Sequence, residues 1–82
     1  MIVYHATTPR KLYRYGRTGA ILPPVFFWTS RYRAVRWARS HNRSVVLSFT
    51  RPEMAHPLPY PQGGAMWSPN LIYQWNREDI HV

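Results

Sequence analysis

The chain has 82 residues, no cysteine and a net charge of +8, with eleven basic residues against three acidic ones. This length fits a single domain covering residues 1–82, and the absence of cysteine excludes disulfide bonds and thiolate-bound metals. The four histidines show no metal-ligand spacing, so we expect no metal site. Because a small domain buries a limited fraction of its surface, the four Trp, six Tyr and three Phe must supply much of the core.

The charge balance indicates a partner that carries phosphate or carboxylate groups. Arginine outnumbers lysine ten to one, and arginine can hold a phosphate with two parallel hydrogen bonds. A GC-rich genome would also favour arginine codons, but it does not explain why acidic residues are so few. The sequence has no apolar run of about 18 residues, so we expect no membrane span. Residues 1–5 do not resemble a signal peptide, and we therefore expect a cytoplasmic protein.

The start of the chain predicts a strand followed by a helix. Residues 2–4 form a short β-prone run. Thr8 and Pro9 fit the N-cap and the first turn of a helix, because a threonine hydroxyl accepts from a free backbone N–H and proline needs no partner there. Gly16 and Gly19 are expected to end this helix.

A second strand, a second helix and a third strand follow. Residues 25–28 read Val-Phe-Phe-Trp, which is typical of a strand. Ser30 is expected to cap a helix that occupies residues 30–43. Residues 44–50 are β-branched and aromatic, and they form the clearest strand in the sequence.

The last third of the chain has weaker signals. Residues 51–66 contain four prolines and predict a long loop, a feature that often marks a functional segment. Ser68 and Pro69 would fit the start of a helix, but the composition of residues 71–75 favours a strand. Residues 76–79 would form a turn, and residues 80–82 a last short strand. Together these elements predict an α+β domain in which two helices pack on a small mixed or antiparallel sheet.

The helix expected over residues 30–43 carries the most informative pattern in the chain. Four of its five arginines fall within one third of the helical wheel, and Trp37 falls on the opposite side, where core packing is expected. The arginine face consists of Arg33, Arg36, Arg39 and Arg43. No carboxylate lies in this stretch, so we expect the face to bind nucleic acid or another phosphate-rich ligand. The alternative is a solvated surface that serves solubility.

A second basic cluster lies on the first predicted helix. It consists of Arg10, Lys11, Arg14 and Arg17. If the two helices lie side by side on the sheet, the two clusters would merge into one groove. No base-reading motif accompanies them, so nucleic acid binding would be electrostatic and independent of base sequence. An acidic protein is the alternative partner for the same charges.

Two segments resemble the N-terminal half of the ADP-ribosyltransferase-like fold, which includes RNA 2′-phosphotransferases and DNA-modifying toxins. The first segment is residues 4–7, Tyr-His-Ala-Thr, at the end of the first strand. The second is residues 25–38, a strand that ends in Thr-Ser and continues into a helix with paired alanines. The resemblance lies mainly within residues 1–50.

This resemblance implies an NAD site and, as an alternative function, an NAD-dependent ADP-ribosyltransferase. In that family a His-x-Thr pair binds the nicotinamide ribose, which would place His5 and Thr7 at the cofactor. The nicotinamide pocket would be lined by Trp28, Thr29 or Ser30. Where the family has a catalytic Glu, the nearest residue is Gln74, with Glu78 after it, so His5 and Gln74 are the catalytic candidates. A glutamine cannot accept a proton, although it can hydrogen-bond the ribose.

Overall fold

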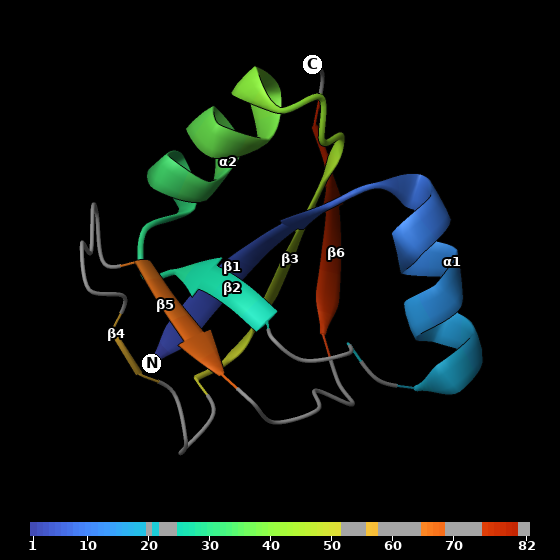
Figure 1. The fold of residues 1–82 in the computed structure, drawn as a ribbon, viewed down its shortest axis with the longest axis horizontal. Coiled ribbons are helices and arrows are strands. Elements are labelled where there is room, and N and C mark those ends of the chain that lie inside the picture. Colours follow the sequence, from blue (N-terminus) through green and yellow to red (C-terminus); the bar gives the residue numbers. More distant parts are fainter. Residues whose placement is uncertain (20, 22–24, 52–55, 58–64, 69–74, 81–82) are drawn as a thin grey trace.

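A computed structural model describes residues 1–19, 21, 25–51, 56–57, 65–68 and 75–80 of the chain. These residues form two helices and six strands (Figure 1). Strands and helices alternate in the first part of the chain, and the second part contains strands alone. In chain order the elements are β1 (Ile2–Thr7), α1 (Pro9–Thr18), β2 (Val25–Trp28), α2 (Arg31–Ser40), β3 (Val45–Thr50), β4 (His56–Pro57), β5 (Ala65–Ser68) and β6 (Asn76–Asp79). The α+β prediction is confirmed.

The strands form one sheet in the order β4-β5-β2-β1-β3-β6, and each described pairing is antiparallel. The longest ladder joins β1 to β3 over six positions, from Ile2 opposite Thr50 to Thr7 opposite Val45. These two strands are rich in β-branched and aromatic residues, which favour a pleated surface. They therefore form the centre around which the other elements are arranged.

Helix α1 begins as its sequence predicts. The Thr8 hydroxyl accepts a hydrogen bond from the Lys11 backbone N–H at 3.2 Å, and Pro9 occupies the first turn. The helix ends at Gly19, which adopts a positive φ of 75° at little cost because it has no Cβ, and the Gly19 N–H bonds the Tyr15 carbonyl at 2.8 Å. Gly16 lies inside the helix, so its predicted role as a stop was wrong.

Helix α2 is shorter than the predicted range of 30–43. Ser30 caps it as expected, accepting from the Arg33 N–H at 3.3 Å, but the helix ends at Ser40. Asn42 then adopts a left-handed conformation with φ of 56°, and the Arg43 N–H bonds the Ala38 carbonyl at 2.8 Å. Because of this turn, Arg43 leaves the helix and does not share its arginine face.

The two helices cover opposite faces of the sheet (Figure 1). On one face, Leu12 and Tyr15 of α1 pack against a cluster of large apolar residues: Val3, Ile21, Val25, Phe27, Val45, Leu47 and Phe49. On the other face, α2 contributes Ala34, Val35 and Ala38, which pack against Ala6 and Val46. The small alanines bring the α2 backbone close to β1, which is the element that α2 contacts most. The helices therefore do not lie side by side.

The C-terminal part differs most from the prediction. The range 51–66, expected to be a loop, contains β4 and the first residues of β5. The predicted turn at residues 76–79 is strand β6, which pairs with β3. Just beyond β6, the Ile80 N–H donates a hydrogen bond to the carbonyl of Ser44, the residue before β3. Backbone pairing, not side-chain propensity, makes this charged segment a strand. Residues 69–74, including most of the strand predicted over 71–75, and the last two residues of the segment predicted over 80–82 lie outside the described residues.

The two phenylalanines of β2 provide a matched test of this core. Phe27 is 1 % exposed and packs edge-on against Phe49 with ring centroids 5.6 Å apart, whereas the neighbouring Phe26 is 46 % exposed. We expect Phe27→Ala to lower the free energy of unfolding by about 3–5 kcal/mol, out of roughly 4–12 kcal/mol for a domain of this length. Phe26→Ala should cost less than about 1 kcal/mol. Urea unfolding followed by circular dichroism measures both, and equal losses would contradict the assigned faces of β2.

Candidate functional site

The sheet is nearly split between β1 and β2. These strands share one paired position, Tyr4 opposite Trp28, whereas β2 pairs with β5 along its full length. Beyond that position a side chain replaces the missing backbone ladder: the His5 Nδ1 atom lies 2.6 Å from the Phe26 carbonyl oxygen. The imidazole therefore spans the opening between the two strands.

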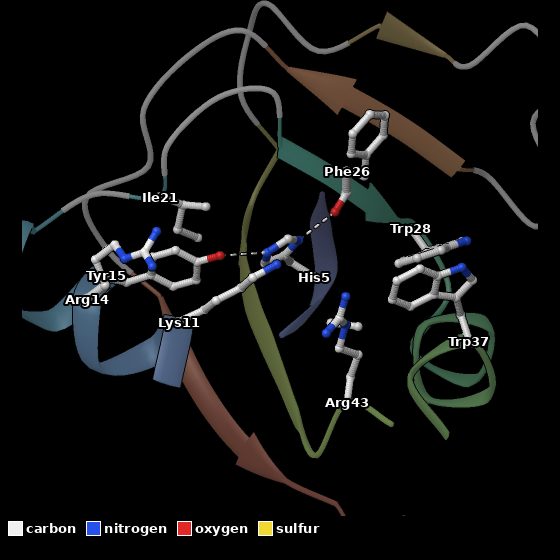
Figure 2. Close-up of a pocket in the computed structure, with 10 residues that line it drawn as sticks. His5, Lys11, Arg14, Tyr15, Ile21, Phe26, Trp28, Trp37 and Arg43 are labelled. Carbon is white, nitrogen blue, oxygen red and sulfur yellow. Dashed lines mark hydrogen bonds between the residues drawn. The ribbon is translucent and has the colours of Figure 1, made fainter. Parts of the chain in front are cut away.

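A cavity of about 570 Å³ lies at this opening (Figure 2). We call it the basic pocket. Its described lining residues are His5, Ala6, Lys11, Arg14, Tyr15, Ile21, Phe26, Trp28, Trp37 and Arg43. They come from both faces of the sheet, with the α1 side chains on one side of His5 and the tryptophans on the other (Figure 2). This volume falls within the range of about 300–1,000 Å³ that is usual for small-molecule sites.

His5 and three polar groups near it form a directional chain of hydrogen bonds. A carbonyl oxygen only accepts, so the bond to Phe26 fixes the proton of a neutral His5 on Nδ1 and leaves Nε2 as an acceptor. The Tyr15 hydroxyl lies 3.5 Å from Nε2 and can donate to it. The Thr7 hydroxyl donates in turn to the Tyr15 oxygen, also at 3.5 Å. This chain connects β1, α1 and β2 around the pocket.

The surroundings of His5 favour its neutral form. Burial of the ring is the largest influence and lowers the pKa of His5, and the nearby cations Lys11 and Arg43 lower it further. The bond to the Phe26 carbonyl acts in the opposite direction, because a donor nitrogen is retained in the charged form. The net effect lowers the pKa of His5 from its ordinary value, which favours the neutral imidazole.

Two tryptophans form one wall of the basic pocket. Trp28 and Trp37 have ring centroids 5.2 Å apart, and His41 stacks on Trp37 at 4.1 Å with an interplanar angle of 13°. The Arg43 guanidinium lies 6.0 Å from the centre of the Trp37 ring, within cation–π range. Trp37 packs against the core cluster under α2, as predicted, but it is only half-buried and also lines the cavity.

The charge in the basic pocket has one sign. Its described lining residues include the cations Lys11, Arg14 and Arg43, and none of them carries a carboxylate. Glu78 is engaged elsewhere: both of its carboxylate oxygens accept from Arg31 at the start of α2, and these bonds lower the pKa of Glu78. Asp79 is paired with Arg77 at 2.7 Å. The described part of the pocket therefore attracts anions.

A second cavity, of about 420 Å³, is lined by the same tryptophan pair. We call it the arginine cavity. It is lined by Arg33, Arg36 and Ser40 of α2 together with Trp28 and Trp37. The two cavities therefore share a wall, and two of the predicted helix arginines lie beside that wall. Arg39, from the same helix, is exposed and lines neither cavity.

The structure brings together some of the residues that the sequence singled out and separates others. His5 and Trp28 line one pocket, and Thr7 is buried behind them. Three of the predicted basic residues, Lys11, Arg14 and Arg43, also line it, even though the two helices do not lie side by side. Other residues that the sequence singled out line neither cavity. They are Arg10, Arg17, Arg39, Thr29 and Ser30, the last of which caps α2. Gln74 lies outside the described residues.

Sequence reasoning missed two partners of His5. The Phe26 carbonyl carries no side-chain signal, so only the spatial arrangement of β1 and β2 shows its role. Tyr15 is the second partner. It is buried and hydrogen-bonded, whereas Tyr13 of the same helix is 71 % exposed.

Comparisons with protein-family models, with curated proteins and with solved structures found no match. Within the described ranges, no helix is long and apolar enough to cross a membrane. The same residues contain no group of three or more His, Cys, Asp or Glu side chains placed to hold a metal ion. The geometry of the two cavities is therefore what bears on function.

The lowered pKa of His5 predicts a pH dependence of stability. Because the unfolded chain binds a proton more readily than the folded one, the free energy of unfolding should fall as the pH drops below about 7, and the loss should end below the folded pKa. In His5→Asn this contribution disappears, while the amide can still donate to the Phe26 carbonyl. Urea unfolding between about pH 7.5 and about pH 5 should therefore show the stability of the two proteins converging. A difference that does not change with pH would contradict the assignment.

Proposed function

We propose that this protein binds a phosphate-bearing ligand, a nucleotide or a nucleic acid, through the basic pocket and the adjacent arginines of α2. The observation that carries the proposal is the composition of the pocket wall, which combines three cations with two tryptophans. Cations hold phosphate oxygens, and aromatic rings contact the flat faces or edges of bases. Few other ligand classes need both on one surface.

The position of the charges supports the same conclusion. Lys11 and Arg14 come from α1, whereas Arg43 comes from the turn after α2, so the cations converge from separate elements. Holding like charges near one another has a cost unless an anion binds among them. Arg43 is half-buried against Trp37, which limits the motion of its side chain. When a phosphate binds, the Arg43 side chain would therefore already lie close to the position that it takes in the complex.

A set of related ligands tests the proposal. ADP and inorganic pyrophosphate should each raise the melting temperature, and adenosine, which lacks phosphate, should raise it much less. A ligand at ten times its Kd stabilises the folded state by about 1.4 kcal/mol, which corresponds to roughly 6–11 °C for a domain of this size. No shift with any phosphate compound or oligonucleotide would overturn the proposal.

Two adjacent residues of α1 provide a matched pair for the same measurement. Lys11 lines the basic pocket, whereas Arg10, also in the first turn and also exposed, does not. Lys11→Gln should weaken ADP binding about fivefold, because the variant loses one partly exposed ion pair with the phosphate. Such a pair is worth ~1 kcal/mol of binding free energy. Arg10→Gln removes the same charge and should leave the affinity within about twofold. Equal losses would indicate a diffuse charge effect in place of a defined site.

An NAD-dependent ADP-ribosyltransferase is the second candidate function. The observation that favours it is that His5 and Trp28, matched from separate motifs, meet in one pocket with Thr7 hydrogen-bonded behind them. In this candidate His5 would contact the nicotinamide ribose, and Gln74 would hydrogen-bond the ribose from the late part of the chain. Glu78 is bound to Arg31 and does not line the described pocket, so it would have to leave that ion pair to take part.

Comparison of NAD with ADP-ribose separates the two candidates. An NAD site should give a larger melting shift with NAD than with ADP-ribose, and slow release of nicotinamide that is detectable by chromatography. His5→Asn should remove the extra shift given by NAD. The unliganded variant should lose about 1 kcal/mol of stability, because the wild-type ring is hydrogen-bonded on both sides. Equal shifts for both ligands and no nicotinamide would leave phosphate binding alone.

A further inference from the structure

The tryptophan pair borders two cavities that an extended ligand could occupy together. Trp28 and Trp37 line both the basic pocket and the arginine cavity. Both His41 and Trp28 pack against the Trp37 ring, so neighbouring rings hold this wall in place. A ligand that crosses this wall would have one part on each side.

The two cavities differ in what they offer. The basic pocket is the larger, at about 570 Å³, and presents aromatic and aliphatic surface together with its cations. The arginine cavity, at about 420 Å³, presents Arg33, Arg36 and the Ser40 hydroxyl, with no carboxylate among its described lining residues. The first can hold a planar base, and the second can hold a phosphate.

We propose that the protein binds single-stranded nucleic acid across the tryptophan wall, with one base in the basic pocket and a flanking phosphate in the arginine cavity. This inference rests on the proposed binding of phosphate-bearing ligands and specifies the substrate class. Arg33 and Arg36 hold the flanking phosphate with charge-assisted hydrogen bonds. Lys11, Arg14 and Arg43 hold the phosphate of the inserted nucleotide.

A duplex does not fit this arrangement. A base can reach the space beside His5 only after it has left its stack and its pairing partner, and that opening costs free energy which a single strand does not spend. Aromatic side chains contact all four bases in a similar way, because every base has a flat π-face, so the same site accepts different bases. The arrangement therefore predicts strand-state selectivity without sequence selectivity.

The first experiment measures the affinity of the full chain for short fluorescent oligonucleotides by anisotropy. The probes are mixed-sequence single strands of DNA and of RNA, a blunt duplex of the same length, and a strand that lacks its bases. Single strands should bind at least tenfold more tightly than the duplex. They should also bind more tightly than the baseless strand by about 5- to 150-fold, because the baseless strand has the same charge but nothing to insert.

Two arginines of α2 provide the matched variants. Arg36 lines the arginine cavity, whereas Arg39, on the same helix and equally free of a described carboxylate partner, lines neither cavity. Arg36→Gln should weaken single-strand binding and reduce the salt slope by about 0.7, the value expected when one phosphate is no longer neutralised. Arg39→Gln should leave the slope unchanged. Melting curves of both variants, each expected close to wild type, check that they fold.

The outcomes separate this inference from the function on which it rests. If ADP shifts the melting temperature but duplex, single strand and baseless strand bind equally, phosphate binding stands and the single-strand inference is overturned. If Arg36→Gln and Arg39→Gln have equal effects, the flanking-phosphate site is overturned. If no phosphate compound and no oligonucleotide binds, both fail.

Discussion

One hydrogen bond, between the His5 imidazole and the Phe26 carbonyl, holds the sheet together where its backbone ladder is interrupted. A carbonyl at a strand opening must find a donor or remain exposed to water, and a side chain supplies the donor here. At this point the His5 ring takes the place of a backbone donor between β1 and β2. The cavity is therefore a direct result of how the sheet is closed at this point.

The same opening explains how residues from opposite faces of a sheet line one cavity. A continuous sheet would separate α1 from α2, because each helix packs on its own face. With β1 and β2 joined at one position, side chains from both helices reach the same space. The two packed faces account for the stability of the domain, and the opening between them accounts for its candidate site.

The sequence predicted those features that depend on neighbouring residues. Thr8 and Ser30 cap their helices because the groups they bond lie three residues away, and the strands at residues 25–28 and 45–50 follow their composition. Strand β6 was not predicted, because its charged residues form a strand only when β3 offers a partner. Arg43 was misplaced because the left-handed turn at Asn42 redirects the chain. The meeting of Lys11, Trp28 and Arg43 depends on tertiary structure, which no local pattern encodes.

The hydrogen-bond chain from Thr7 through Tyr15 to His5 has a fixed polarity, since the Phe26 carbonyl at its end can only accept. A second proton on His5 would turn Nε2 into a donor, and the Tyr15 hydroxyl hydrogen would then have to find another acceptor. An anionic ligand in the pocket would supply that acceptor as well as a counter-charge. Proton uptake by the imidazole and binding of such an anion would then be thermodynamically linked, and each would strengthen the other.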